Sequence, residues 1–191
     1  MRIALSGAVL VAALLGDPAS AAPPPPETIQ SIMDTVVDPS ADALWASAGT
    51  VVTATGPRRH APRTAQERAK ARALALRIVA GAKLLQGPRP VGRNGHWALA
   101  DAATPGIRSA AQIEADIARD PQTFYRAAAR LQRTAQDAAD ALGRRDMGAF
   151  LDAGARIDAA CEACHAGYWY PRDPPRPLPD PAMFAGAAGR P

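Results

Sequence analysis

The chain has 191 residues, of which 48% are hydrophobic and only 5% are aromatic. This length suits one domain with its own core and leaves little room for two. Alanine supplies much of the apolar content, which favours close packing of helices over sheets built from β-branched and aromatic side chains, so we expect an all-α protein. The formal net charge of +4 is modest, and since the chain has no recognisable nucleic-acid-binding motif, we expect no nucleic-acid partner.

Residues 1–21 are predicted to be a secretory signal peptide. Arg2 precedes an apolar run, Ile3–Leu15, and the small residues Ala19 and Ala21 mark a cleavage site after Ala21. That run is roughly 13 residues long, short of the ~20 that a membrane-spanning helix needs, and no later segment is apolar enough to span. We therefore expect an exported, periplasmic protein that is soluble rather than membrane-spanning.

Residues 22–26 include four consecutive prolines and are expected to form an extended leader into the domain. The first helix follows. Its apolar stripe has the spacing i, i+3, i+4, i+7 and consists of Ile29, Ile32, Met33 and Val36. Asp38 and Pro39 interrupt the pattern, and Asp38 is placed to cap a restart with Pro39 at its first position. The sequence therefore predicts a kinked or broken first helix, followed by a loop over 49–62.

The next segment is strongly basic, with a single acid, Glu67, among eight basic residues. The eight are Arg58, Arg59, Arg63, Arg68, Lys70, Arg72, Arg77 and Lys83. Thr64 and Glu67 match a capping box, which predicts a long helix that begins here and runs to about Gln86. The basic residues form either a solvated helix face or a docking surface for an acidic partner, and the sequence alone does not choose between these two interpretations.

Residues 87–108 are predicted to be a long connection, which Trp97 folds back onto the domain. A further helix begins near Ser109 and is broken or restarted at Asp120 and Pro121. Beyond the restart, apolar side chains recur at alternating spacings of three and four, as in the seam of a bundle.

A tight connection over 143–146 leads into the last helix and implies an antiparallel neighbour. Pro171 ends that helix, and the proline-rich tail, 171–191, is expected to be extended or disordered. The four major helices predict an antiparallel four-helix bundle over residues 27–170.

Both cysteines of the chain lie in the last helix, in the sequence Cys-x-x-Cys-His. Cys161, Cys164 and His165 occupy positions i, i+3 and i+4, so they share one helix face. This is the attachment signature of c-type haem, in which each sulfur forms a thioether with the haem and the histidine ligates the iron. We therefore expect one covalently bound haem c per chain, and export is consistent with this because thioether attachment takes place outside the cytoplasm in bacteria.

The cysteine pair has two other possible uses, a zinc site and a redox-active dithiol. A zinc site would have to recruit a methionine or the distant His60 and His96, since there is no second cysteine pair. A redox-active dithiol is expected beside a βαβ pattern, which the sequence lacks. Covalent haem is the favoured interpretation, and a dithiol oxidoreductase is kept as a lesser alternative.

The chain resembles the class II cytochromes c, the cytochrome c′ group, over about residues 27–170. The resemblance rests on the stretch "CEACHAGYWYP" near the end of the last helix and on "TIQSIMDTVVDPSADALW", a first helix that carries a methionine. It implies a four-helix bundle with haem near the C-terminal end of the last helix. The interruption at Asp38 and Pro39, the connection over 87–108 and the proline-rich tail depart from the pattern of the family.

The resemblance also implies that the sixth iron position faces the first helix, where Met33 is the matching residue. A methionine ligand there gives a low-spin haem suited to electron transfer, whereas an open, five-coordinate iron binds nitric oxide or carbon monoxide. Met33 lies on the apolar stripe, so periodicity does not distinguish a ligand from a core residue. His60 and His96, which lie in loops, are weaker candidates. Met147 is not expected to ligate because it lies far along the last helix from His165, nor is Met183 because it lies in the tail.

The predicted function is single-electron transfer between redox protein partners by a mono-haem c-type cytochrome with iron ligated by His165 and Met33. The alternative is a five-coordinate haem protein that binds or senses nitric oxide or carbon monoxide. No catalytic set of side chains is visible, so we do not expect an enzyme. The resemblance suggests a homodimer through the first two helices, although the basic segment would crowd like charges at such a contact.

Overall fold

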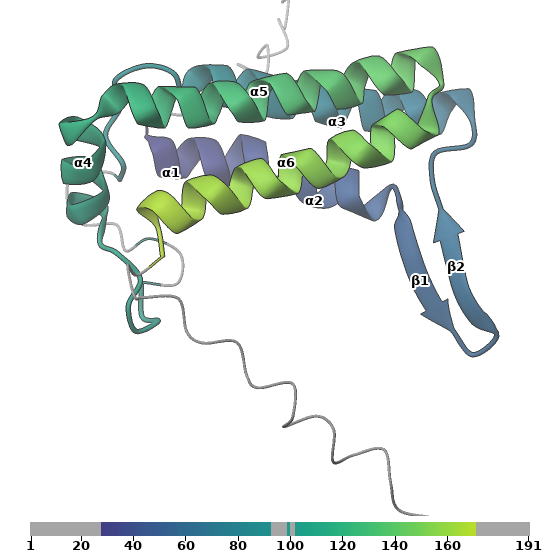
Figure 1. Ribbon diagram of the computed structural model, residues 1–191, viewed down its shortest axis with the longest axis horizontal. Helices are drawn as coiled ribbons and strands as arrows, with labels where there is room; N and C mark the ends of the chain where they lie inside the picture. Colours follow the sequence, from purple (N-terminus) through teal and green to yellow (C-terminus); the bar gives the residue numbers. More distant parts are fainter. Residues whose placement is uncertain (1–27, 93–98, 100–101, 171–191) are drawn as a thin grey trace, which may run out of the picture.

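The computed structural model describes residues 28–92, 99 and 102–170 (Figure 1). Several sequence expectations fall outside this range. They concern the signal peptide, the proline-rich leader, His96, Trp97, Met183 and the proline-rich tail.

The described chain is mostly helical, as expected for an all-α protein, and carries one small two-stranded sheet. In chain order the elements are α1 (Ile29–Ile32), the π-helix η1 (Met33–Val37), α2 (Asp38–Ala46), β1 (Gly49–Thr53), β2 (Gly56–His60), α3 (Ala65–Leu84), α4 (Ala110–Arg119), α5 (Pro121–Arg144) and α6 (Met147–Tyr168). Among the described residues, no helix combines the length and the apolar character needed to cross a membrane.

The expected loop over 49–62 is wrong, because most of this segment forms an antiparallel β-hairpin. Thr50 pairs with Arg59 and Val52 with Pro57 in its register. The first strand holds four consecutive β-branched residues, which favour extended backbone. Gly56 adopts a φ of +112° at the turn, and the Thr53 hydroxyl donates a hydrogen bond of 2.7 Å to its carbonyl oxygen. Figure 1 shows the hairpin extending away from the helices.

The first helix is interrupted where expected, but not by a capped restart. A π-helical turn, η1, joins α1 to α2 without a break, and the backbone N–H of Asp38 donates to the carbonyl oxygen of Met33. The side chain of Asp38 therefore caps nothing here. Pro39 explains the wider turn, since it has no N–H to donate to Thr35 and its ring would clash with that carbonyl group. The freed carbonyl oxygen of Thr35 accepts a hydrogen bond from Arg77 at 3.5 Å.

The predicted helix starts in the middle of the chain are confirmed. Thr64 and Glu67 form the capping box of α3, with the Thr64 N–H donating to the Glu67 carboxylate at 2.9 Å and the Glu67 N–H donating to the Thr64 hydroxyl at 3.1 Å. Asp120 separates α4 from α5 and accepts the Thr123 N–H at 3.1 Å. At the far end of α5, Arg145 takes a left-handed conformation with a φ of 62° in the turn to α6.

The long helix α5 packs against both α3 and α6, and α3 packs in turn on η1 and α2. Packing of α6 on the first helix is sparse by comparison. Alanines occupy many of the buried positions between the helices, which allows the close spacing that the composition predicts. In Figure 1, α6 begins at the end of the molecule where the hairpin lies and ends beside α4, so the cysteine motif lies at the α4 end.

Candidate functional site

The motif of α6 lines an apolar pocket inside the helical body. Cys161, Cys164 and His165 contribute to one wall of this pocket, whose volume is about 70 Å³. Side chains from α5, including Phe124 and Leu131, form another wall. The three motif residues are all partly buried. Their common orientation follows from the spacing i, i+3, i+4 on a regular helix, as the sequence predicted.

Met33 lines the same pocket from a different helix. It is the first residue of η1, and it is partly buried and packs against the hydrophobic core. The structure therefore brings together the four residues singled out in the sequence: two thiols and an imidazole on α6, and a thioether on η1. A π-helical turn often marks a functional position within a helix, and here it begins at Met33.

The α4 end of the pocket is lined by apolar residues that no sequence pattern singles out. Val91 and Leu99 are buried and form a second apolar cluster with Ile113 of α4. Tyr168 and Trp169 pack against this cluster from the end of α6. In the sequence, Val91 and Leu99 are isolated aliphatic residues in a long connection, and they lack the periodicity that identifies a core position.

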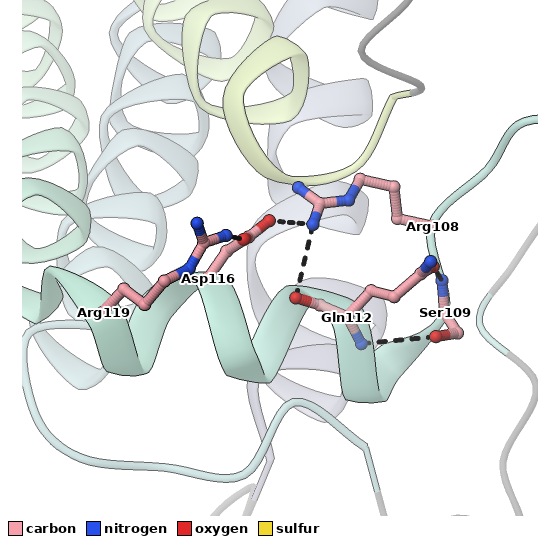
Figure 2. Close-up of polar contacts among 5 residues, drawn as sticks. All are labelled: Arg108, Ser109, Gln112, Asp116 and Arg119. Atoms are coloured by element: carbon pink, nitrogen blue, oxygen red, sulfur yellow. Dashed lines mark hydrogen bonds and ion pairs between the residues drawn. The ribbon is translucent and has the colours of Figure 1, made fainter.

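An ion-pair network centred on the buried Asp116 ties Arg108 to α4 (Figure 2). The carboxylate of Asp116, whose side chain is 3% exposed, pairs with both Arg108 and Arg119. Arg108 also donates its backbone N–H to the carbonyl oxygen of Trp169 at 3.1 Å. Ser109 caps α4 by accepting the Gln112 N–H at 3.3 Å. This network could not be predicted from the sequence, because its partners come from the long connection and from a buried position of α4.

The aromatic residues that follow the motif pack at the end of α6. The rings of Tyr168 and Phe124 meet edge to face with centroids 5.3 Å apart, which joins α6 to α5. The rings of Trp169 and Tyr170 lie 6.0 and 6.1 Å from the ring of His165. The carbonyl oxygen of His165 accepts the backbone N–H groups of both residues, at 2.7 and 3.0 Å. These contacts hold the segment around His165 in place.

Neither cysteine is disulfide-bonded. Burial raises the pKa of the Cys161 thiol to about 11, assisted by the nearby Cys164, Asp38 and Asp158. Burial alone raises the pKa of Cys164 to about 11. Both thiols are therefore protonated at neutral pH, whereas the reactive thiol of a dithiol oxidoreductase has a lowered pKa.

Two other residues considered as iron ligands, His60 and Met147, lie elsewhere. The imidazole of His60 is at the end of β2, with Nε2 3.3 Å from the carbonyl oxygen of Ala46, and it lines a separate pocket between α2 and α3. Met147 is the first residue of α6, about 21 Å along the helix from Cys161, since each helical residue adds about 1.5 Å. Neither residue lines the pocket that contains the motif.

Within the described ranges, no three His, Cys, Asp or Glu side chains are arranged to hold a metal ion directly. A haem iron needs no such cluster, because the porphyrin supplies four ligands and the protein supplies only axial ones. The chain matches no protein-family model, no curated protein and no solved structure.

Proposed function

We propose that this protein is a periplasmic mono-haem c-type cytochrome that carries single electrons between redox proteins. The observation that carries the proposal is the shared pocket: Cys161, Cys164 and His165 face the same apolar space as Met33. Covalent haem c would be held by thioethers to the two cysteines, with His165 as one axial ligand and Met33 as the other. The bound haem would supply the one-electron chemistry, and the protein acts as a carrier rather than an enzyme.

We also propose a finer architecture for the fold. The continuous helix α1–η1–α2, together with α3, α5 and α6, is interpreted as an antiparallel four-helix bundle that resembles the class II cytochromes c. In this interpretation α4 and the β-hairpin are additions to the bundle. The pocket then lies near the C-terminal end of the last helix, where the resemblance implies that haem is bound.

The residues around the motif fit a flat, largely apolar group. The pocket walls are almost entirely aliphatic and aromatic, so they would exclude water from an iron bound to His165. The pocket is smaller than a porphyrin, so the helices that line it would have to move apart to admit the ring. α6 packs extensively on α5, and it would keep that packing as the pocket widens.

The dithiol alternative is less well supported. The raised pKa values of Cys161 and Cys164 keep both sulfurs protonated at neutral pH, which is the opposite of what thiol–disulfide exchange requires. A covalent attachment instead uses both sulfurs permanently and is compatible with partly buried positions.

One observation favours a second function, the binding of nitric oxide or carbon monoxide by five-coordinate iron. Met33 packs against the hydrophobic core from the apolar side of its helix, a position that a residue with no role in ligation would also take. Absorption spectra of the purified oxidised and reduced protein decide between the two functions. A low-spin spectrum that carbon monoxide leaves unchanged supports electron transfer, and a high-spin spectrum that shifts on its addition supports gas binding.

A further inference from the structure

A groove runs along the surface between α2 and α6. It consists of two adjoining hollows of about 340 and 210 Å³, and both are lined by Trp45 and Asp158. Because these two residues belong to both hollows, the hollows form one continuous feature, the α2–α6 groove. One end is lined by Leu44, Phe150 and other apolar or small residues, and the opposite end reaches Cys161 and His165.

The carboxylates of the groove are concentrated at the end near His165. Asp38 and Asp42 project from α2, and Asp158 and Glu162 project from α6; all four are exposed and line that hollow. None of the four forms an ion pair with a described residue, and no Lys or Arg of the described chain lines the groove. This end of the groove therefore presents a concentrated negative charge on a chain whose formal net charge is +4.

Asp38 responds to its position at this end of the groove, mainly through desolvation and to a lesser extent through the charges around it. Although the residue is exposed at the surface, the protein around its carboxyl group partly displaces water and so raises its pKa; the nearby His165 opposes the rise, and the negative charges of Asp34 and Asp42 add to it. A positive group placed in the groove would relieve this repulsion.

The centre of the groove is apolar and exposed. The side chain of Trp45 is 42% exposed where the two hollows meet, and Leu151, at the other end, is 45% exposed. Large apolar side chains surrounded by polar groups are typical of protein–protein contacts, and tryptophan is enriched among the residues that contribute most to binding. The groove thus has both an apolar anchor and a charged border.

The groove adjoins the proposed haem site. Cys161 and His165 line the groove as well as the apolar pocket, so both residues lie between the two. A protein seated in the groove would therefore be close to the iron ligand of the proposed cytochrome.

The geometry points to the α2–α6 groove as the docking surface for a basic redox protein, with Trp45 as the apolar anchor and the four carboxylates paired with lysines and arginines of the partner. This inference rests on the proposed function. In the complex, one electron leaves the protein that is oxidised and enters the one-electron centre of the protein that is reduced, and no covalent bond changes.

Two other occupants fit the groove less well. A second copy related by a two-fold axis would bring two sets of four carboxylates together. Basic residues of this chain, such as Arg63 and Lys70, line a separate hollow on the α3 side of α2. An acidic partner would therefore find positive charge in that hollow and not in the groove.

The test uses the full-length, haem-loaded protein and a basic cytochrome c of the mitochondrial type as the probe. Affinity is measured by calorimetry and electron exchange by stopped-flow absorption, at low and high ionic strength. The groove variant is the double charge reversal Asp158→Lys with Glu162→Lys. The control, Asp152→Lys with Glu114→Lys, changes the net charge equally at exposed positions that line neither the groove nor the haem pocket.

At low ionic strength, we expect the groove variant to bind the probe about 10-fold more weakly or worse, and to exchange electrons with it correspondingly more slowly. At high ionic strength this difference should disappear. The control variant should stay within about twofold of the natural protein in both conditions. Trp45→Ala should weaken binding at both salt concentrations. Succinylation of the lysines of the probe should abolish the difference between groove and control variants.

Equal effects of the groove and control variants would overturn the inference, as would a homodimer that the groove variant dissociates. Circular dichroism of each variant shows whether it is folded, and Asp158→Asn provides a milder change if the double reversal is not. Failure of the proposed function is recognised separately, because a chain without covalent haem fails a haem stain before any binding is measured.

Discussion

Gly81 of α3 lies directly against Val37 of the π-helical turn: a Cβ atom built on Gly81 would come within 2.6 Å of Val37 Cγ2 and 3.2 Å of Val36 Cγ1. Both Gly81 and Val37 are buried, so neither side has room to yield. The close approach of α3 to the first helix therefore depends on a glycine at this position, and through η1 it supports the helix that carries Met33.

Gly81→Ala should destabilise the protein by about 1–3 kcal/mol, the usual cost of overpacking a core, because the clash exceeds the gain of about 1 kcal/mol in helix propensity. Urea unfolding followed by circular dichroism measures the change. Gly143→Ala is the matched control, since a Cβ there meets only Arg72 Nε at 3.7 Å, and it should be neutral or stabilising. An equal change in the free energy of unfolding in the two variants would show that α3 and η1 do not approach each other this closely.

The ion-pair network at the end of α6 gives a second stability prediction. Asp116→Asn removes the buried carboxylate and leaves the guanidinium of Arg108, whose side chain is 14% exposed, without its counter-charge. The expected loss is about 3–5 kcal/mol, as for breaking a buried ion pair on one side. Arg119→Gln should cost only about 0–1 kcal/mol, because that side chain is 68% exposed. A similar loss in both variants would contradict the view that burial makes the difference.

The capping box of α3 makes stability depend on pH. The backbone N–H groups of Thr64 and Arg63 lower the pKa of Glu67, so the charged carboxylate stabilises the folded chain at neutral pH. This contribution is present above the ordinary pKa of a glutamate and is lost as the pH falls through the lowered value. Glu67→Gln should therefore unfold at lower urea than the natural protein at pH 7, and the gap between their midpoints should close in acid. A gap that is unchanged by pH would show that charge plays no part in the cap.

The parts of the fold that follow from local rules could be predicted from the sequence. The Thr64–Glu67 box and the Asp120–Pro121 restart place helix ends accurately, because each is set by hydrogen bonds within a few residues. The motif residues could be assigned to one face of α6 for the same reason, since helical periodicity is a local property.

The features that were missed depend on contacts between distant segments. The Gly, Pro and Thr content of residues 49–62 predicts a loop, whereas the β-branched run of β1 favours the strand that the structure shows. No periodic pattern in the sequence connects Val91 with Ile113, which pack together in the structure. The same is true of Arg108 and Asp116, which form an ion pair. The π-helical turn at Met33 was expected only as an interruption, because its form depends on where Thr35 and Pro39 place their backbone groups.

Met33 provides the sharpest test of the axial ligand. In haem-loaded protein, Met33→Ala should convert a low-spin spectrum to a high-spin one that responds to carbon monoxide, because no other described methionine lines the pocket. Met147→Ala, at the opposite end of α6, should leave the spectrum unchanged. If Met33→Ala also leaves it unchanged, the assignment of Met33 as ligand is wrong, and the haem could still be present.

The most direct test of the central claim is the mass of the protein exported from a host able to mature c-type cytochromes. We predict that intact-protein mass spectrometry shows the processed chain plus one haem, that the pyridine haemochrome spectrum is that of two thioether bonds, and that Cys161→Ser with Cys164→Ser loses both signals. The account would be contradicted by a colourless chain that has the mass of the bare polypeptide and two free thiols. The host must load a control cytochrome with haem normally in the same experiment.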